Sequence, residues 1–117
     1  MRKEKAKKHF LGQSGHEKLN CSQAVIKAFH DAFDAPAQAV DAFAACGGGN
    51  APQGRCGAYH AAHYLISQTD SSRAAKLEQE FLNAAGALTC SEIRRKRKIT
   101  CLGCVEIAAD FLEGGRE

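Results

Sequence analysis

The chain has 117 residues, a length that favours one domain able to bury a modest core of its own. Its 16 basic and 13 acidic residues leave a net charge of only +3, which argues against a dedicated nucleic-acid binder. Strand-favouring residues are scarce, and no segment alternates polar and apolar residues. The sequence predicts an all-α fold, a compact bundle of about six to seven short helices forming one domain over residues 1–117, with 1–15 as a candidate flexible segment.

We infer the cellular compartment from the start of the chain, and the compartment determines whether the cysteines are interpreted as disulfides or as free thiols. The first ten residues are basic and lack the apolar run of a signal peptide, and no stretch is long enough to span a bilayer. We therefore expect a cytoplasmic protein without membrane insertion. Six cysteines are well above ordinary usage for this length. In a reducing cytosol such cysteines are more often metal ligands or redox-active thiols than structural disulfides.

The first half of the chain predicts three helices. Residues 3–11 form a short amphipathic helix, which the glycines of residues 12–15 end. Asn20 is a good N-cap for a second helix, whose apolar residues recur at the spacing of one buried stripe. Pro36 suits the first turn of a third helix, which we expect to continue through Phe43.

A glycine-rich loop with a cysteine near each end then separates the third and fourth helices. Residues 47–49 are consecutive glycines, and Pro52 and Gly54 follow, so this segment cannot continue a helix. Cys46 closes the third helix. Cys56 opens the fourth, whose apolar face extends through the alanines that follow.

Two further helices are predicted between residues 70 and 98. Asp70 or Ser71 caps a fifth helix, and Gly86 loosens its end. A short sixth helix begins in the segment 89–92 and includes the basic residues 94–98. That basic run is most simply a solvated face, although it also suits docking of an acidic electron-transfer partner.

The seventh helix carries the closest pair of cysteines. Thr100 caps it, Cys101 and Cys104 lie in its first turns, and the glycines 114–115 end it. The Cys101-x-x-Cys104 spacing is used by dithiol pairs, zinc sites and iron–sulfur clusters, so it does not choose among them.

Four cysteines share one predicted position, the first turn of a helix: Cys21, Cys56, Cys90 and Cys101. Free backbone amides and the positive end of the helix dipole stabilise a thiolate there. We therefore expect these helix N-termini to meet at one electropositive pocket that holds anionic sulfur, with Cys104 or Cys46 as possible substitute ligands.

Three functions fit this pattern, and an iron–sulfur cluster is our leading hypothesis. Four thiolates suit an iron–sulfur cluster of undecided nuclearity that serves electron transfer, with Gly54 and Gly57 supplying backbone amides near the sulfurs. A thiol–disulfide oxidoreductase would use Cys101 with Cys104, or Cys56 with a partner, and no metal. A structural zinc site would also use thiolates. The alternative to all three is that the free cysteines only fill the core. His60 or His63 is a weaker candidate for a ligand or proton donor beside Cys56.

Several segments in the right order resemble the C-GCAxxG-C-C family of bacterial and archaeal redox-active proteins. They are residues 20–25 (Asn-Cys-Ser-Gln-Ala-Val), 47–58 (Gly-Gly-Gly-Asn-Ala-Pro-Gln-Gly-Arg-Cys-Gly-Ala), Cys90, and 101–109 (Cys-Leu-Gly-Cys-Val-Glu-Ile-Ala-Ala). The chain departs from the family pattern at Arg55 and at Ala61, where the family has glycine.

The resemblance implies a small helical redox protein more than a classical enzyme. A related domain accompanies the haem-binding part of split-Soret cytochromes, where an iron–sulfur centre is associated with it. The family's recurrent cysteines match Cys21, Cys56, Cys90 and Cys101; Cys104 matches a cysteine of some members, and Cys46 is an extra. The partner we expect is another redox protein, not nucleic acid, and a homodimer is an open alternative to a monomer.

Overall fold

The computed structural model describes residues 2–12, 19–33, 35–44, 54–69, 72–96 and 99–114. Within these ranges the regular elements are helices: α1 (Arg2–Leu11), α2 (Cys21–Phe29), the 3-10 helix η1 (His30–Phe33), α3 (Ala39–Ala42), α4 (Gly57–Thr69), α5 (Ser72–Ala85), α6 (Cys90–Lys96) and α7 (Cys101–Gly114). The extended pairing found among the described residues is a single isolated bridge between Arg55 and Thr89. The expected all-α class is confirmed.

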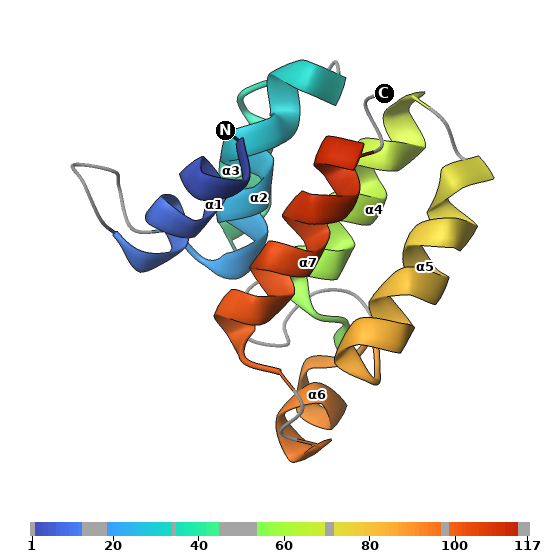
Figure 1. The fold of residues 1–117 in the computed structure, drawn as a ribbon. Coiled ribbons are helices and arrows are strands. Elements are labelled where there is room, and N and C mark those ends of the chain that lie inside the picture. Colours follow the sequence, from blue (N-terminus) through green and yellow to red (C-terminus); the bar gives the residue numbers. More distant parts are fainter. Residues whose placement is uncertain are drawn as a thin grey trace.

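Three helices at the centre of the bundle run in the same direction. Figure 1 shows that α2, α4 and α7 all begin at the lower end of the molecule and rise toward the upper end. The α4 helix packs against α2, α7 and α5, while α1 packs across α2 and α7. The N-termini of the three central helices therefore lie at the same end of the fold.

Small and aromatic side chains share the core between these helices. The alanines of the packed faces of α4 and α7 are fully buried, which lets helix backbones approach closely: Ala58, Ala61, Ala62, Ala108 and Ala109. Tyr59 and Phe81 fill the space between α4 and α5, with ring centroids 5.3 Å apart. No helix in the described part of the chain is long and apolar enough to cross a membrane.

The start of α2 is fixed by the predicted cap. The Asn20 side chain accepts a hydrogen bond from the Gln23 amide at 2.8 Å, and the Gln23 side chain accepts one from the Asn20 amide at 3.3 Å. The side-chain amide of Asn20 also donates to the carbonyls of Phe43 and Ala44, at 3.3 and 2.9 Å. Asn20 therefore joins the start of α2 to the end of α3.

The third helix is shorter than the sequence predicted. Instead of extending from Pro36 through Phe43, regular α-helix covers only Ala39–Ala42. Ahead of it, the Ala39 amide donates to the carbonyl of Pro36 at 3.0 Å, a turn that closes over three residues rather than four. The glycines 47–49, the predicted caps Asp70 and Ser71, and the basic residues 97–98 lie outside the described residues.

Replacing Asn20 should destabilise the fold measurably. Asn20→Ala removes both the cap acceptor and the donor to α3, and we expect a loss of about 2 kcal/mol in the free energy of unfolding. Asn20→Ser keeps a cap acceptor but cannot reach both carbonyls, so we expect a loss of about 1 kcal/mol. Urea denaturation of both variants provides the measurement. Equal losses in the two variants would show that the cap contributes nothing.

Candidate thiol site

The cysteines lie at the starts of helices, as the sequence predicted. Cys21 and Cys90 are the first residues of α2 and α6, Cys56 directly precedes α4, and Cys101 is the first residue of α7. The starts of α2, α4 and α7 share one end of the bundle, and α6 lies at that same end (Figure 1). The side chain of Cys101 and all of Cys46 are outside the described residues. That all four sulfurs meet in one pocket stays a prediction.

Cys56 uses its sulfur to cap α4. Its side chain accepts hydrogen bonds from the backbone amides of Tyr59 and Ala58, which are among the donors that a helix start leaves unpaired. Its carbonyl accepts from the His60 amide at 2.9 Å, the first regular bond of the helix. The sulfur therefore lies at the positive end of the helix dipole, where negative charge is stabilised.

The second group at this sulfur is Cys104, from α7. A hydrogen bond donated by the Cys104 side chain is the largest influence on Cys56 and lowers its pKa; burial opposes this, and the amides of Tyr59 and Ala58 add to the lowering. The net effect lowers the pKa of Cys56 to about 7. At neutral pH a large share of Cys56 is therefore thiolate, which is the nucleophilic form.

Cys104 owes its position to the first turn of α7. Its amide donates to the Thr100 carbonyl, and the Thr100 hydroxyl caps the helix by accepting from the Gly103 amide, each at 3.0 Å. Cys104 is 2% exposed, so it faces the core. Its thiol partner in the described structure is Cys56 on α4. The alternative pair of Cys101 with Cys104 stays a prediction.

Backbone contacts hold the segment that leads into Cys56 beside the segment that leads into Cys90. The Cys56 amide donates to the Leu88 carbonyl at 2.7 Å, and Arg55 forms its antiparallel bridge with Thr89. Thr89 directly precedes Cys90, and its hydroxyl donates to the Glu92 carboxylate at 3.2 Å. Cys90 is buried at 9% exposure. The segments that carry Cys56 and Cys90 are thus held side by side.

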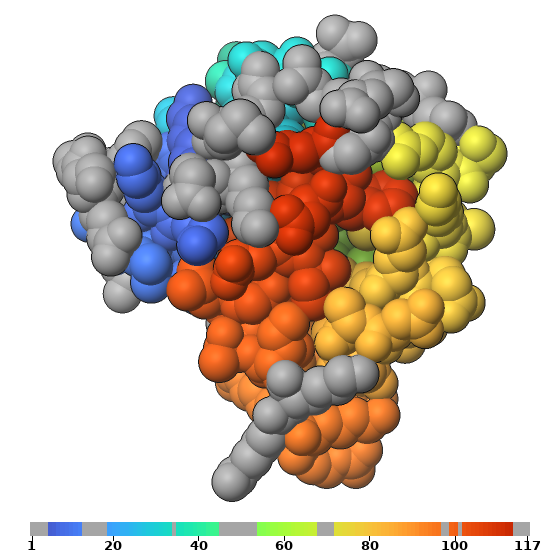
Figure 2. Space-filling model, viewed as in Figure 1, coloured from blue at the N-terminus to red at the C-terminus, as the bar shows by residue number. Residues whose placement is uncertain are grey.

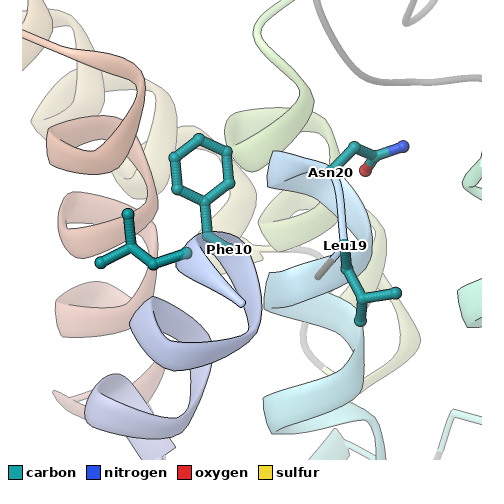
Figure 3. A pocket seen from close by; sticks show the side chains of 4 residues that line it. Phe10, Leu19 and Asn20 are labelled. Atoms are coloured by element: carbon teal, nitrogen blue, oxygen red, sulfur yellow. The ribbon is translucent and has the colours of Figure 1, made fainter. Parts of the chain in front are cut away.

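Cys21 follows a segment that lines a surface cavity. The cavity, of about 510 Å³, is lined among the described residues by Phe10, Leu11, Leu19 and Asn20. Figure 3 shows Phe10 entering from α1, and Leu19 and Asn20 from the segment ahead of α2. The amide group of Asn20 is engaged with α3. None of these four described lining residues is titratable.

The two histidines of α4, His60 and His63, follow Cys56 along the same helix. Burial, followed by the charges of Arg55 and His63, lowers the pKa of His60 and so favours its neutral ring. That ring packs on Phe43, with centroids 5.3 Å apart. Within the described residues, no three histidine, cysteine, aspartate or glutamate side chains are grouped so as to hold a metal ion.

The two candidate glycines occupy different positions. Gly54 has φ +72°, and a Cβ added to it would meet nothing within 4 Å, so glycine is favoured there by backbone conformation and not by close approach. Gly57 is the buried first residue of α4, directly after the Cys56 sulfur. Their contact with a cofactor stays a prediction.

Comparison with known proteins places the chain in a family. The family described as "Putative redox-active protein (C_GCAxxG_C_C)" matches residues 19–114, which include every helix from α2 to α7 and all six cysteines. Searches of curated proteins and of solved structures each found no match. Because the match covers most of the 117 residues, the chain belongs to the C_GCAxxG_C_C family.

Proposed function

We propose that this protein is a thiol–disulfide redox protein in which Cys56 and Cys104 alternate between two thiols and one disulfide. The supporting observation is the hydrogen bond between these side chains, which come from different helices and meet at the start of α4. The family description as redox-active agrees with such chemistry. The family description names no reaction, so we infer the substrate class, a partner that carries a disulfide, from the chemistry of the two thiols.

Each thiol has its own role in the exchange. The Cys56 thiolate attacks one sulfur of a partner disulfide, so that a mixed disulfide forms and the partner's other sulfur leaves as a thiolate. Cys104 then gives up its proton to that leaving thiolate and attacks the Cys56 sulfur. The mixed disulfide breaks and releases the partner's second sulfur as a thiolate. Two electrons pass from the protein to the partner, whose two sulfurs end as one thiol and one thiolate.

Exposure and acidity support assigning the attack to Cys56. Cys56 is 6% exposed against 2% for Cys104, so it is the more accessible residue of the two. A pKa of about 7 also lies near the optimum for an attacking thiol, because lower values weaken the nucleophile and higher values reduce the thiolate fraction. Cys104 donates a hydrogen bond to the Cys56 sulfur, so it already lies beside the sulfur that it attacks in the second step.

An iron–sulfur cluster that serves electron transfer is the second candidate. Cys21, Cys56, Cys90 and Cys101 would hold it, with Cys104 or Cys46 as substitutes, and the bound cluster would supply one-electron chemistry. It is supported by the placement of cysteine-bearing helix starts at one end of the bundle (Figure 1). We rank the thiol pair first because the Cys56–Cys104 hydrogen bond joins two described side chains, whereas the Cys101 side chain of the cluster candidate lies outside the described residues. Zinc on the same thiolates is a structural variant of this candidate.

Serine variants separate the thiol pair from a cluster. With oxidised glutathione as the oxidant, we expect Cys56→Ser and Cys104→Ser to abolish the internal disulfide, while Cys21→Ser and Cys90→Ser leave it intact. Peptide mapping identifies the bond. Iron, zinc and acid-labile sulfide are measured in parallel on protein purified without oxygen. Stoichiometric iron and sulfide that disappear in Cys21→Ser and Cys90→Ser would overturn the thiol pair in favour of the cluster.

The hydrogen bond from Cys104 should set the acidity of Cys56. We expect the alkylation rate of Cys56 by iodoacetamide to rise with pH around a midpoint near 7 in the native protein. Cys104→Ala removes the donor that lowers this pKa, so the midpoint should move upward toward the ordinary cysteine value of about 8.5. Cys104→Ser keeps a hydroxyl donor and should stay near the native midpoint. Identical midpoints in all three proteins would contradict the assignment.

A further inference from the structure

The last turn of α6 is an exposed basic surface that the thiol chemistry does not use. Arg94, Arg95 and Lys96 are all exposed there. The Arg95 side chain is 73% exposed and has a long ion pair of 3.7 Å with Glu92, the acidic residue of this helix. Figure 2 shows α6 forming the lower tip of the molecule. The tip therefore presents more positive than negative charge to a partner.

This basic end of α6 is connected to the thiol site through a few residues. The Lys96 ammonium donates to the Gly86 carbonyl at 2.9 Å. Two residues further along, the Leu88 carbonyl accepts from the Cys56 amide at 2.7 Å. The segment that supports the basic turn is therefore also the segment bonded to the reactive helix start. A partner that rests on α6 lies at the same end of the bundle as Cys56 (Figure 1).

We propose that the basic end of α6 docks the acidic face of the redox protein that exchanges disulfides with Cys56. This inference rests on the proposed thiol–disulfide function and adds the charge of the partner. Opposite charges on the two faces would raise the rate of encounter and orient the partner's disulfide toward the start of α4. The effect would weaken with salt, since the charged side chains are exposed.

A protein suits this surface better than a nucleic acid does. The seven residues of α6, Cys-Ser-Glu-Ile-Arg-Arg-Lys, include no aromatic side chain on which a base could stack. The neighbouring thiols also need a partner that carries a disulfide. A protein with acidic residues beside its disulfide matches both the basic charge of α6 and the chemistry of the thiols.

Two synthetic disulfide peptides test the proposal, one flanked by glutamates and one by glutamines at the same positions. At low salt we expect the reduced protein to exchange with the acidic peptide roughly tenfold faster than with the neutral one. The ratio of the two rates should fall toward one in the double variant Arg94→Glu/Arg95→Glu, and also in the native protein at high salt. The matched control Lys27→Glu/Lys76→Glu, which reverses two exposed lysines on α2 and α5, should keep the native ratio.

The outcomes distinguish a failure of docking from a failure of the function. If both peptides react at equal rates in the native protein, docking is wrong while the thiol function stands. If neither peptide forms a Cys56–Cys104 disulfide, the proposed function fails and the docking proposal fails with it. A ratio reduced equally by both double variants would show a general charge effect and overturn the assignment to α6. Single-stranded oligonucleotide binding that is lost in Arg94→Glu/Arg95→Glu, without any peptide preference, would identify nucleic acid as the partner.

Discussion

The Cys56 sulfur at the start of α4 is the group on which the arrangement of the site depends. A helix leaves its first amides without partners, and a side chain ahead of the helix must satisfy them. Here a sulfur accepts from the Tyr59 and Ala58 amides, where an oxygen is the usual acceptor. Because these donors favour the charged form, the same contact that completes the helix also makes Cys56 a better nucleophile.

Burial and hydrogen bonding act in opposite directions on this thiol. Removing Cys56 from water raises its pKa, because the charged form loses hydration. The hydrogen bonds from Cys104 and the two amides outweigh that effect and bring the pKa to about 7. A buried cysteine without these donors would be an inert core residue. The packing of α7 on α4 brings Cys104 to the sulfur, and this contact is the largest cause of the lowered pKa of Cys56.

Much of this arrangement was predictable from local sequence patterns. Asn20 and Thr100 cap their helices as expected, because a cap depends on residues within one turn. The cysteines at helix starts were predictable for the same reason. The pairing of Cys56 with Cys104 was not, since the side chains are far apart in sequence and meet only through helix packing. Sequence spacing instead favoured Cys101 with Cys104. The short α3 was also missed, because Pro36 fits a turn as well as the start of a helix.

The direction of the central helices brings the cysteine-bearing helix starts and the basic end of α6 to one end of the molecule. Parallel α2, α4 and α7 place their amide-rich starts together, and at the start of α4 the amides lower the pKa of Cys56. The chain returns to the same end after α5, and the Leu88 and Thr89 backbone bonds then fix the beginning of α6 beside Cys56. With Cys56 only 6% exposed, a large partner has little freedom in how it approaches the sulfur. In the docking that we propose, the charged surface of α6 would supply the orientation that such a narrow approach requires.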